Sequence, residues 1–372
     1  MKEEIEEKLE RLIRLINEEG LGGILINLQP NFAWLTAGGR NGIDSSREAG
    51  VGTLLIRRDG RKFILANRIE MPRIVSEELV GQDYEPVEFG WEEERSSPSF
   101  VADLARTITN EGLPLGSDAS CGNATCVLES AISRARYRLT DHEIDRFRSL
   151  GRDAGDAIGS LARALPPGIS EREVARRAID ALGDIGATSS VMLVAADERI
   201  KQFRHPVPTD LVWRKSLMIV VCARRAGLIA SLTRLVCVGE IPDDLVRRTE
   251  AAAGVSAKMF AATKPGASGS DVFEVASRAY CEAGFSGEEH FHHQGGAAGY
   301  RTRDWIAHPL CGETIHARQA FAWNPSITGT KIEETSIALE TGLEVITTTA
   351  DWPSIRAHAN GCEYLLPGIL TL

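Results

Sequence analysis

The sequence predicts a smaller α/β domain followed by an α+β domain that is built from two similar halves. Three observations support this prediction. The chain has 372 residues, which is more than one average domain contains. Residues 1–134 alternate between helix-like and strand-like segments, and residues 135–372 contain two stretches that follow one plan. We therefore place the domain boundary between residues 134 and 135.

The first domain begins with a helix, because apolar residues recur at helical spacing over residues 3–19 and Gly20 follows. Residues 22–38, GGILINLQPNFAWLTAG, are interpreted as a buried strand that ends in a Pro-Asn turn. Residues 50–67 predict a hairpin, since Asp59-Gly60 is a strong turn signal between two apolar runs. Alternating helices and strands are expected up to about residue 133.

The second domain begins with a long amphipathic helix, for which Thr140 and Glu143 have the spacing of a capping box. Residues 165–190 and 263–288 then share one plan: Pro-Gly, a capping signal, an amphipathic helix, a glycine and a strand-rich stretch. The two capping signals are Ser170 with Glu173 and Ser268 with Asp271. This duplication predicts two halves, about 140–240 and 241–350, that are related by a pseudo-twofold axis.

The strand-rich segments of the second domain are residues 216–240, 290–300 and 320–347, and their turn signals predict antiparallel meanders. Helices combined with antiparallel sheet make this domain α+β. A domain of two halves tends to hold its site in the crevice between them. We expect the functional site there.

Composition excludes several classes of protein. A formal net charge of -10 argues against a nucleic-acid partner, which would need a basic face. No apolar run is long enough to cross a bilayer, and the acidic, helical N-terminus does not resemble a signal peptide. The seven cysteines are scattered and include no C-x-x-C pair, which predicts reduced thiols in the cytoplasm. Cys222 and Cys237 lie in strand-like runs and are expected in the core.

Five short motifs, in order along the chain, carry a family resemblance. They are NFAWLTAGG (31–39), LTDHEIDRFR (139–148), PPGISEREVA (166–175), ASLTRLVCVGE (230–240) and GTKIEETSIALETGLEVIT (329–347). With them the chain resembles the creatinase/aminopeptidase P/prolidase superfamily, the M24 or pita-bread fold, over essentially its whole length. The resemblance implies a creatinase-like N-terminal α/β domain before a pita-bread domain, and a homodimer in which a loop of the first domain can reach the partner's site.

Three histidines, His290, His292 and His293, lie beside glycines in HFHHQGGAAGYRTRDW and suggest a metal site. The metallopeptidases of the family bind two divalent ions through two Asp, one His and two Glu. Carried onto this sequence, those positions hold Val220, Ser231, Gly296, Asn324 and Glu333. One carboxylate cannot hold two dications against their mutual repulsion. We therefore predict no metal cofactor; a single ion on one of the three histidines with Glu333, or a conventional Mn, Co or Zn site, stays as the alternative.

Creatinase shares the fold, binds no metal and cleaves a C–N bond with a histidine. The matching segment, IKQFRHPVPTD, assigns His205 as the acid/base, a role that suits an imidazole whose pKa lies near neutral. Glu333 is expected to orient His205, hold a substrate cation or act as a second acid/base. His292 is the third catalytic candidate. Because His292 and His293 are expected to alternate along a strand, only one of them should face the crevice.

The candidates for substrate binding come from four places. Gly296, with Gly295, is expected to open space and expose backbone N–H groups. Asn324 offers a neutral donor and acceptor, and Arg303, with Arg301, is a candidate partner for a substrate carboxylate. Arg40 and Asn41 lie in the loop over residues 36–50 that the resemblance places near the partner's site.

Three functions follow as hypotheses. The first is a metal-independent hydrolase, or related lyase or isomerase, that acts on a small polar amide or C–N substrate less cationic than creatine. The second is a metal-dependent Xaa-Pro aminopeptidase or prolidase. The third is a non-catalytic homologue that binds a small molecule or acts as a dimeric scaffold.

Overall fold

The computed structural model describes residues 2–109, 112–122 and 125–372, and the chain divides into two compact units, Met1–His142 and Glu143–Leu372. In the described part of the chain no helix combines the length and the apolar character that a membrane span requires.

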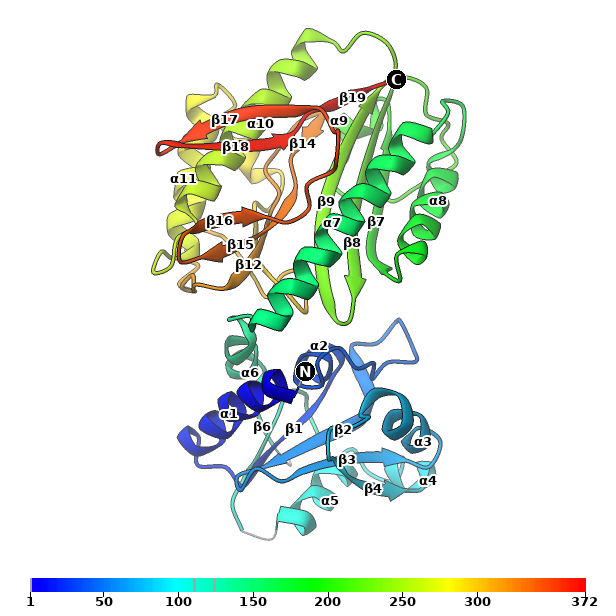
Figure 1. Cartoon of the computed structure of the whole chain (residues 1–372), viewed down its shortest axis with the longest axis vertical. Helices are drawn as coiled ribbons and strands as arrows, with labels where there is room; N and C mark the ends of the chain where they lie inside the picture. The colour runs from blue at the N-terminus through cyan, green and yellow to red at the C-terminus, as the bar shows by residue number, and fades with distance from the viewer. Residues whose placement is uncertain (1, 110–111, 123–124) are drawn as a thin grey trace. The chain divides into compact units, whose positions relative to one another are not determined.

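The first unit is a mixed sheet with helices on its faces (Figure 1). The strand order is β4-β3-β2-β1-β5-β6. The strands are β1 (Gly23–Leu28), β2 (Ala49–Arg57), β3 (Lys62–Asn67), β4 (Glu85–Phe89), β5 (Leu115–Ser117) and β6 (Cys126–Val127). The helices are α1 (Lys2–Glu18), α2 (Gln29–Leu35), α3 (Met71–Arg73), η1 (Ile74–Glu78), α4 (Trp91–Glu94), α5 (Phe100–Thr109) and α6 (Glu129–Arg136).

The predicted hairpin is confirmed as β2 and β3, with Gly60 at a positive φ of 87° in its turn. The predicted Pro-Asn turn is wrong, because residues 29–35 form helix α2 instead. Pro30 lies in the first turn of that helix, where a missing N–H costs nothing. The sequence QPNFAWL contains a complete apolar face, and all its residues from Pro30 onward are buried.

The second unit contains two sheets of unequal size, each covered by helices (Figure 1). Its helices are α7 (Asp141–Ala164), α8 (Glu171–Asp184), α9 (Arg199–Gln202), α10 (Asp243–Ala262), α11 (Gly269–Glu282) and η2 (Glu288–His290). The four-stranded sheet has the order β19-β9-β8-β7, with β7 (Thr188–Ala196), β8 (Ser216–Arg225), β9 (Leu228–Cys237) and β19 (Ile369–Thr371).

The five-stranded sheet of this unit has the order β11-β10-β12-β15-β16. Its strands are β10 (Gly295–Ala298), β11 (Trp305–Ile306), β12 (Gln319–Trp323), β15 (Glu334–Leu339) and β16 (Gly342–Val345). Two small hairpins complete the unit, β13 (Ser326–Ile327) with β14 (Thr330–Lys331) and β17 (Ser354–Ala359) with β18 (Cys362–Pro367). The predicted antiparallel meanders are confirmed.

The duplication within this unit is confirmed by its hydrogen bonds. Ser170 and Ser268 are the N-caps of α8 and α11, and each accepts a hydrogen bond from the backbone N–H three residues later. The N–H of Gly168 donates to the carbonyl of Trp213 at 3.0 Å, and that of Gly266 donates to the carbonyl of Ile315 at 2.9 Å. The same local design therefore occurs once in each half.

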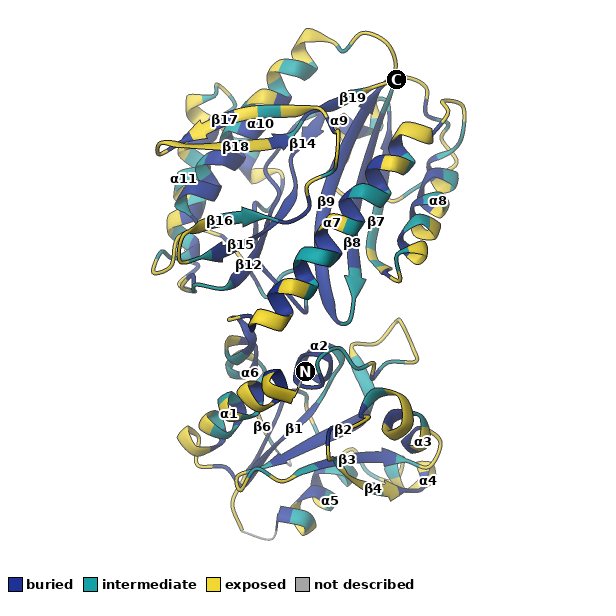
Figure 2. Cartoon of the chain, viewed as in Figure 1, coloured by how far each residue is buried: buried dark blue, intermediate teal, exposed yellow. Residues whose placement is uncertain are grey.

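The two halves join along β9 and β15, which are both buried (Figure 2). The Thr335 hydroxyl donates to the carbonyl of Ser231 at 2.9 Å, and the Ser231 N–H donates back to that hydroxyl at 2.7 Å. The Thr233 N–H donates to the carbonyl of Glu333 at 3.1 Å. This junction brings Glu333 beside the strands of the first half.

Candidate active site

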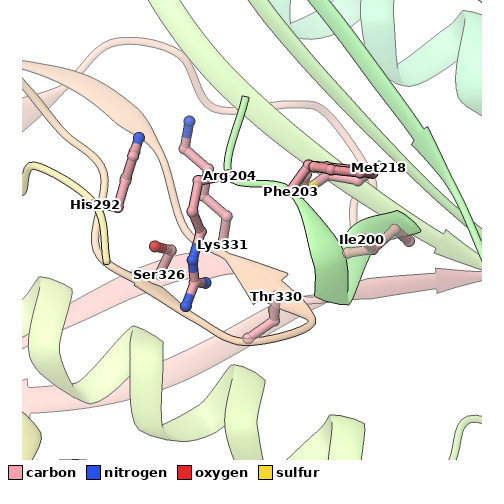
Figure 3. A pocket seen from close by; sticks show the side chains of 8 residues that line it. All are labelled: Ile200, Phe203, Arg204, Met218, His292, Ser326, Thr330 and Lys331. Carbon is pink, nitrogen blue, oxygen red and sulfur yellow. The ribbon is translucent and has the colours of Figure 1, made fainter. Parts of the chain in front are cut away.

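A pocket lies where the two halves meet, and residues of both halves line it (Figure 3). The lining residues are Ile200, Phe203, Arg204, Met218, His292, Ser326, Thr330 and Lys331. The pocket therefore lies in the predicted place, between the repeats.

Three imidazoles gather beside this pocket. His205 follows helix α9, and its Nε2 lies 3.0 Å from Nε2 of His292. The rings of His292 and His293 lie 4.5 Å apart, centroid to centroid, at an angle of 31°. The prediction that only one of these two residues faces the crevice is wrong, because both precede strand β10 in irregular backbone and do not alternate. His290 is not part of the cluster, since its side chain is 73% exposed.

The imidazoles are neutral at physiological pH. Burial lowers the pKa of His292 to about 2 and that of His293 to about 4, and the Lys331 charge acts in the same direction on both rings. The pKa of His205 is also lowered, by partial burial and then by Lys331. Neutral imidazole is the form that accepts a proton.

Glu333 is buried and fully paired with cations of the same chain. Its Oε1 lies 3.0 Å from Nη2 of Arg303, and its Oε2 lies 2.8 Å from Nζ of Lys331. The Thr233 hydroxyl donates to Oε2 at 2.9 Å. Burial alone would raise the pKa of Glu333, but the two cations outweigh burial and hold it at about 2.

These contacts correct two predicted roles. A carboxyl group with a pKa of about 2 does not act as an acid/base near neutral pH, and its oxygens are engaged by Thr233, Arg303 and Lys331 rather than by His205. Arg303 was expected to bind a substrate carboxylate, but its guanidinium pairs with Glu333. Arg303 and Glu333 therefore neutralise each other within the chain, and neither is free to bind a charged substrate group.

The strands that face Glu333 carry no carboxylate at the positions that the resemblance assigns to metal ligands. In the β8–β9 ladder, Cys222 pairs with Ser231 and Val220 pairs with Thr233, so these four side chains lie on one face of the sheet. The Ser231 hydroxyl donates to the Cys222 sulfur at 3.2 Å, and burial raises the pKa of that thiol. This set of side chains does not fit a pair of divalent ions.

One group in the described ranges has the composition of a metal site: His205, His292 and His293, whose ligand nitrogens lie within 4.8 Å of one another. The side chain of Glu333 does not complete it, because Lys331 and Arg303 occupy that carboxylate. Lys331 lines the same pocket as His292, and its charge opposes a further cation there.

Gly295 and Gly296 do not open space, which corrects their predicted role. A Cβ at Gly296 would lie 1.9 Å from the carbonyl oxygen of Trp305, and a Cβ at Gly295 would lie 2.1 Å from that of Ala322. Strand β10 is paired on both sides, with β11 and β12. The glycines are therefore required by close packing of three backbones.

Gly296→Ala is expected to lower the free energy of unfolding by about 2–3 kcal/mol, because the added methyl group must displace backbone. Gly312→Ala is the matched control, since a Cβ at Gly312 meets nothing within 4 Å. Urea unfolding followed by circular dichroism measures both variants. Equal stability of the two would contradict the close packing of β10 against β11.

The other three candidates for substrate binding differ in where the structure places them. Asn324 is buried, and its Oδ1 has no hydrogen-bond partner. Asn41 was expected to contact substrate, but it is buried in the first unit, where its amide bonds Asn27 and Gly52 at 2.8 Å. Arg40 is exposed on the same loop, and its substrate role stays a prediction.

Lys331 is one of the pocket residues that the sequence analysis did not name, and it makes the strongest contact with Glu333. The signal was present, because residues two apart in extended backbone point to the same side and Lys331 precedes Glu333 by two. In GTKIEET, Lys331 and Glu333 were therefore recognisable as opposite charges on one side of the chain, although their burial was not.

The comparisons with known proteins identify the family of this fold. The model of metallopeptidase family M24 matches residues 145–347, which is more than half of the chain. The chain belongs to family M24. No curated protein matches the chain by sequence.

Solved structures share the M24 fold over nearly the whole chain. The Xaa-Pro dipeptidase from Bacillus anthracis is 20% identical, covers 99% of this chain and 100% of its own, and has a TM-score of 0.76. A prolidase from Thermococcus sibiricus is 18% identical over 98% of each chain, with a TM-score of 0.79. The N-terminal domain of the FACT complex subunit SPT16 from Cicer arietinum is 9% identical over 94% of this chain and 97% of its own, with a TM-score of 0.69. These likenesses confirm the predicted pita-bread fold.

Proposed function

We propose that this M24 protein is a metal-independent hydrolase that cleaves a small polar amide or related C–N bond with His205 as its acid/base. The observation that carries the proposal is the pairing of buried Glu333 with Arg303 and Lys331. Glu333 is the one carboxylate at the positions that hold metal ligands in the family, and the side-chain cations of Arg303 and Lys331 both form ion pairs with it. The charge that divalent ions would supply is thus provided by side chains.

The chemistry needs only a proton acceptor that later becomes a donor. Neutral His205 takes a proton from water as the water oxygen bonds to the amide carbon. The protonated ring then donates that proton to the leaving nitrogen as the C–N bond breaks. His292 contacts His205 through Nε2 at 3.0 Å and stabilises the ring orientation and the transient charge.

Purified protein is expected to contain well under one divalent ion per chain, and turnover is expected to survive prolonged treatment with a chelator. Plasma mass spectrometry gives the metal content. A panel of N-acyl amino acids, ureas and Xaa-Pro dipeptides gives the turnover. His205→Gln should lower turnover at least about a hundredfold, in line with the loss of a general acid/base, while His308→Gln, on an exposed loop, should not.

Other outcomes identify the alternatives. Two divalent ions per chain together with cleavage of Xaa-Pro dipeptides would support the alternative of a metal-dependent Xaa-Pro aminopeptidase or prolidase. One ion per chain that is lost in His205→Gln would indicate a mononuclear site on the three imidazoles. Turnover that His205→Gln leaves unchanged would contradict the proposed mechanism, and no turnover on any compound would favour a non-catalytic homologue.

A further inference from the structure

One buried carboxylate holds the loop that carries His205. Glu171 is the first residue of helix α8, and its side chain is fully buried. Its Oε1 accepts a hydrogen bond from the N–H of Ala196 at 2.8 Å, and its Oε2 accepts from the N–H and the hydroxyl of Thr209 at 2.8 and 2.7 Å. Arg199 forms an ion pair with the same carboxylate. Both ends of the loop, at residues 196 and 209, are therefore fixed to one side chain by charge-assisted hydrogen bonds.

The same contacts reach the backbone next to His205. Nη1 of Arg199 donates to the buried carboxylate, and Nη2 of Arg199 donates to the carbonyl of Val207 at 3.1 Å. The N–H of Val194, in strand β7, donates to the carbonyl of Pro206 at 3.2 Å. Because proline also fixes its own φ, the backbone that follows His205 has little freedom.

The residue before His205 is attached to the other half of the domain. Arg204 forms an ion pair with Glu288, and its Nη2 donates to the Thr328 hydroxyl at 3.1 Å. The Thr328 N–H in turn donates to Glu288 at 3.0 Å. The loop is thus attached to the first half through helix α8 and to the second half through Arg204. His205 lies in sequence between these attachments, and its Nε2 is 3.0 Å from that of His292.

The duplication indicates that the fold alone does not require a carboxylate at residue 171. Gly269 occupies the equivalent position in helix α11, one residue after the N-cap. Its N–H donates to the carbonyl of Glu313 at 2.9 Å, just as the N–H of Glu171 donates to that of Leu211 at 2.9 Å. The two helix starts therefore share their backbone hydrogen bonds. Glycine adds no side chain to this arrangement, whereas Glu171 adds one that holds the loop of His205.

We infer that Glu171 is a positioning residue for His205. By fixing the ends of the loop, it keeps the imidazole against His292 and in place for proton transfer. A displacement of about 1 Å at an acid/base can cost about a hundredfold in rate, so a rigid support for the ring has a direct chemical value. This inference rests on the proposed function, because that function gives His205 its task.

Glu171→Gln tests the inference, since it keeps the size of the side chain and removes its charge. It is expected to lower kcat at least about tenfold and to change KM less than about threefold, because misplacing an acid/base affects the chemical step more than binding. Glu173→Gln is the matched control and should leave both constants unchanged. Glu173 lies on the same helix and pairs with two arginines of that helix, Arg176 and Arg177.

A double variant distinguishes positioning from a general loss of stability. In the His205→Gln background, Glu171→Gln should cause no further fall in kcat, because the residue that it positions is already gone. A further fall as large as that in the unmodified protein would overturn the inference. Such a result would show that Glu171 acts on turnover independently of His205.

Nuclear magnetic resonance of isotope-labelled histidine rings at pH 8 follows the position of His205 without turnover. Comparison with His205→Gln assigns its ring signals. Glu171→Gln is expected to shift these signals and to leave those of the exposed His142 unchanged. Thr209→Val removes one hydrogen bond to Glu171 and no charge, so it should shift the same signals by a smaller amount and serves if Glu171→Gln does not fold.

The two measurements separate this inference from the proposed function. Ring signals of His205 that stay unchanged in folded Glu171→Gln and in Thr209→Val would overturn the inference, with or without detectable turnover. Turnover that does not depend on His205 would instead contradict the proposed function. In that case a shift of the ring signals in both variants would still support the positioning of His205 by Glu171.

Discussion

Replacing Arg303 and Lys331 together with methionine is expected to lower the free energy of unfolding at pH 8 by about 3–5 kcal/mol. Both side chains pair with Glu333, whose side chain is 3% exposed. The double variant leaves that carboxylate buried without a cation, which is costly because desolvation is no longer offset. Urea unfolding with comparison of the m-values measures the change.

A third substitution tests whether the unpaired charge of Glu333 causes this loss of stability. Adding Glu333→Gln to it removes the unpaired charge and should recover at least half of the lost stability. Removing the exposed cations Arg278 and Lys258 changes the net charge equally and should cost under about 1 kcal/mol. If the triple variant is no more stable than the double, the loss comes from the packing of the long side chains and not from charge.

Acidification from pH 7 to pH 4 is expected to lower the free energy of unfolding by about 3–6 kcal/mol through His292 and His293. The folded-state pKa values are about 2 and about 4, against an ordinary value of 6.5. Below pH 6.5 these two histidines therefore bind protons in the unfolded chain but stay neutral in the folded chain. The free energy of unfolding falls as the pH falls. Each pKa difference corresponds to about 1.4 kcal/mol per unit.

Variants assign this pH dependence to the site. His292→Gln and His293→Gln should each flatten the curve of stability against pH between 6.5 and 4. His358→Gln changes a histidine that is 69% exposed and is the matched control. Glu333 acts at lower pH, because its depressed pKa adds a stabilisation that is lost only between about 4.5 and 2. A flat curve in the unmodified protein would contradict the buried, neutral state of the imidazoles.

Much of the fold was predictable because its signals are local. Caps at Ser170 and Ser268, the Asp59-Gly60 turn and the repeated Pro-Gly helix start are all fixed by neighbouring residues. The helix over residues 29–35 was not predicted, because a Pro-Asn pair suits both a turn and a first helical turn. Tertiary burial of Phe32 and Trp34 decides between them.

The site was predictable only in part, because its contacts join segments far apart in the sequence. His205 and His292 were named for catalysis, and the fold places their Nε2 atoms 3.0 Å apart. The pairing of Glu333 with Arg303 spans 30 residues and depends on the order of β10, β12 and β15 within one sheet. The homodimer and the cytoplasmic location stay predictions.

Gly296 limits how this site can be redesigned. A histidine at this position would begin with a Cβ 1.9 Å from the Trp305 carbonyl oxygen, so an imidazole does not fit there while strand β11 stays paired with β10. Building a dinuclear metal centre here would therefore require a shift of β11 as well as new carboxylates on β8 and β9. Substituting the ligand positions one at a time is expected to destabilise the sheet before any metal can bind.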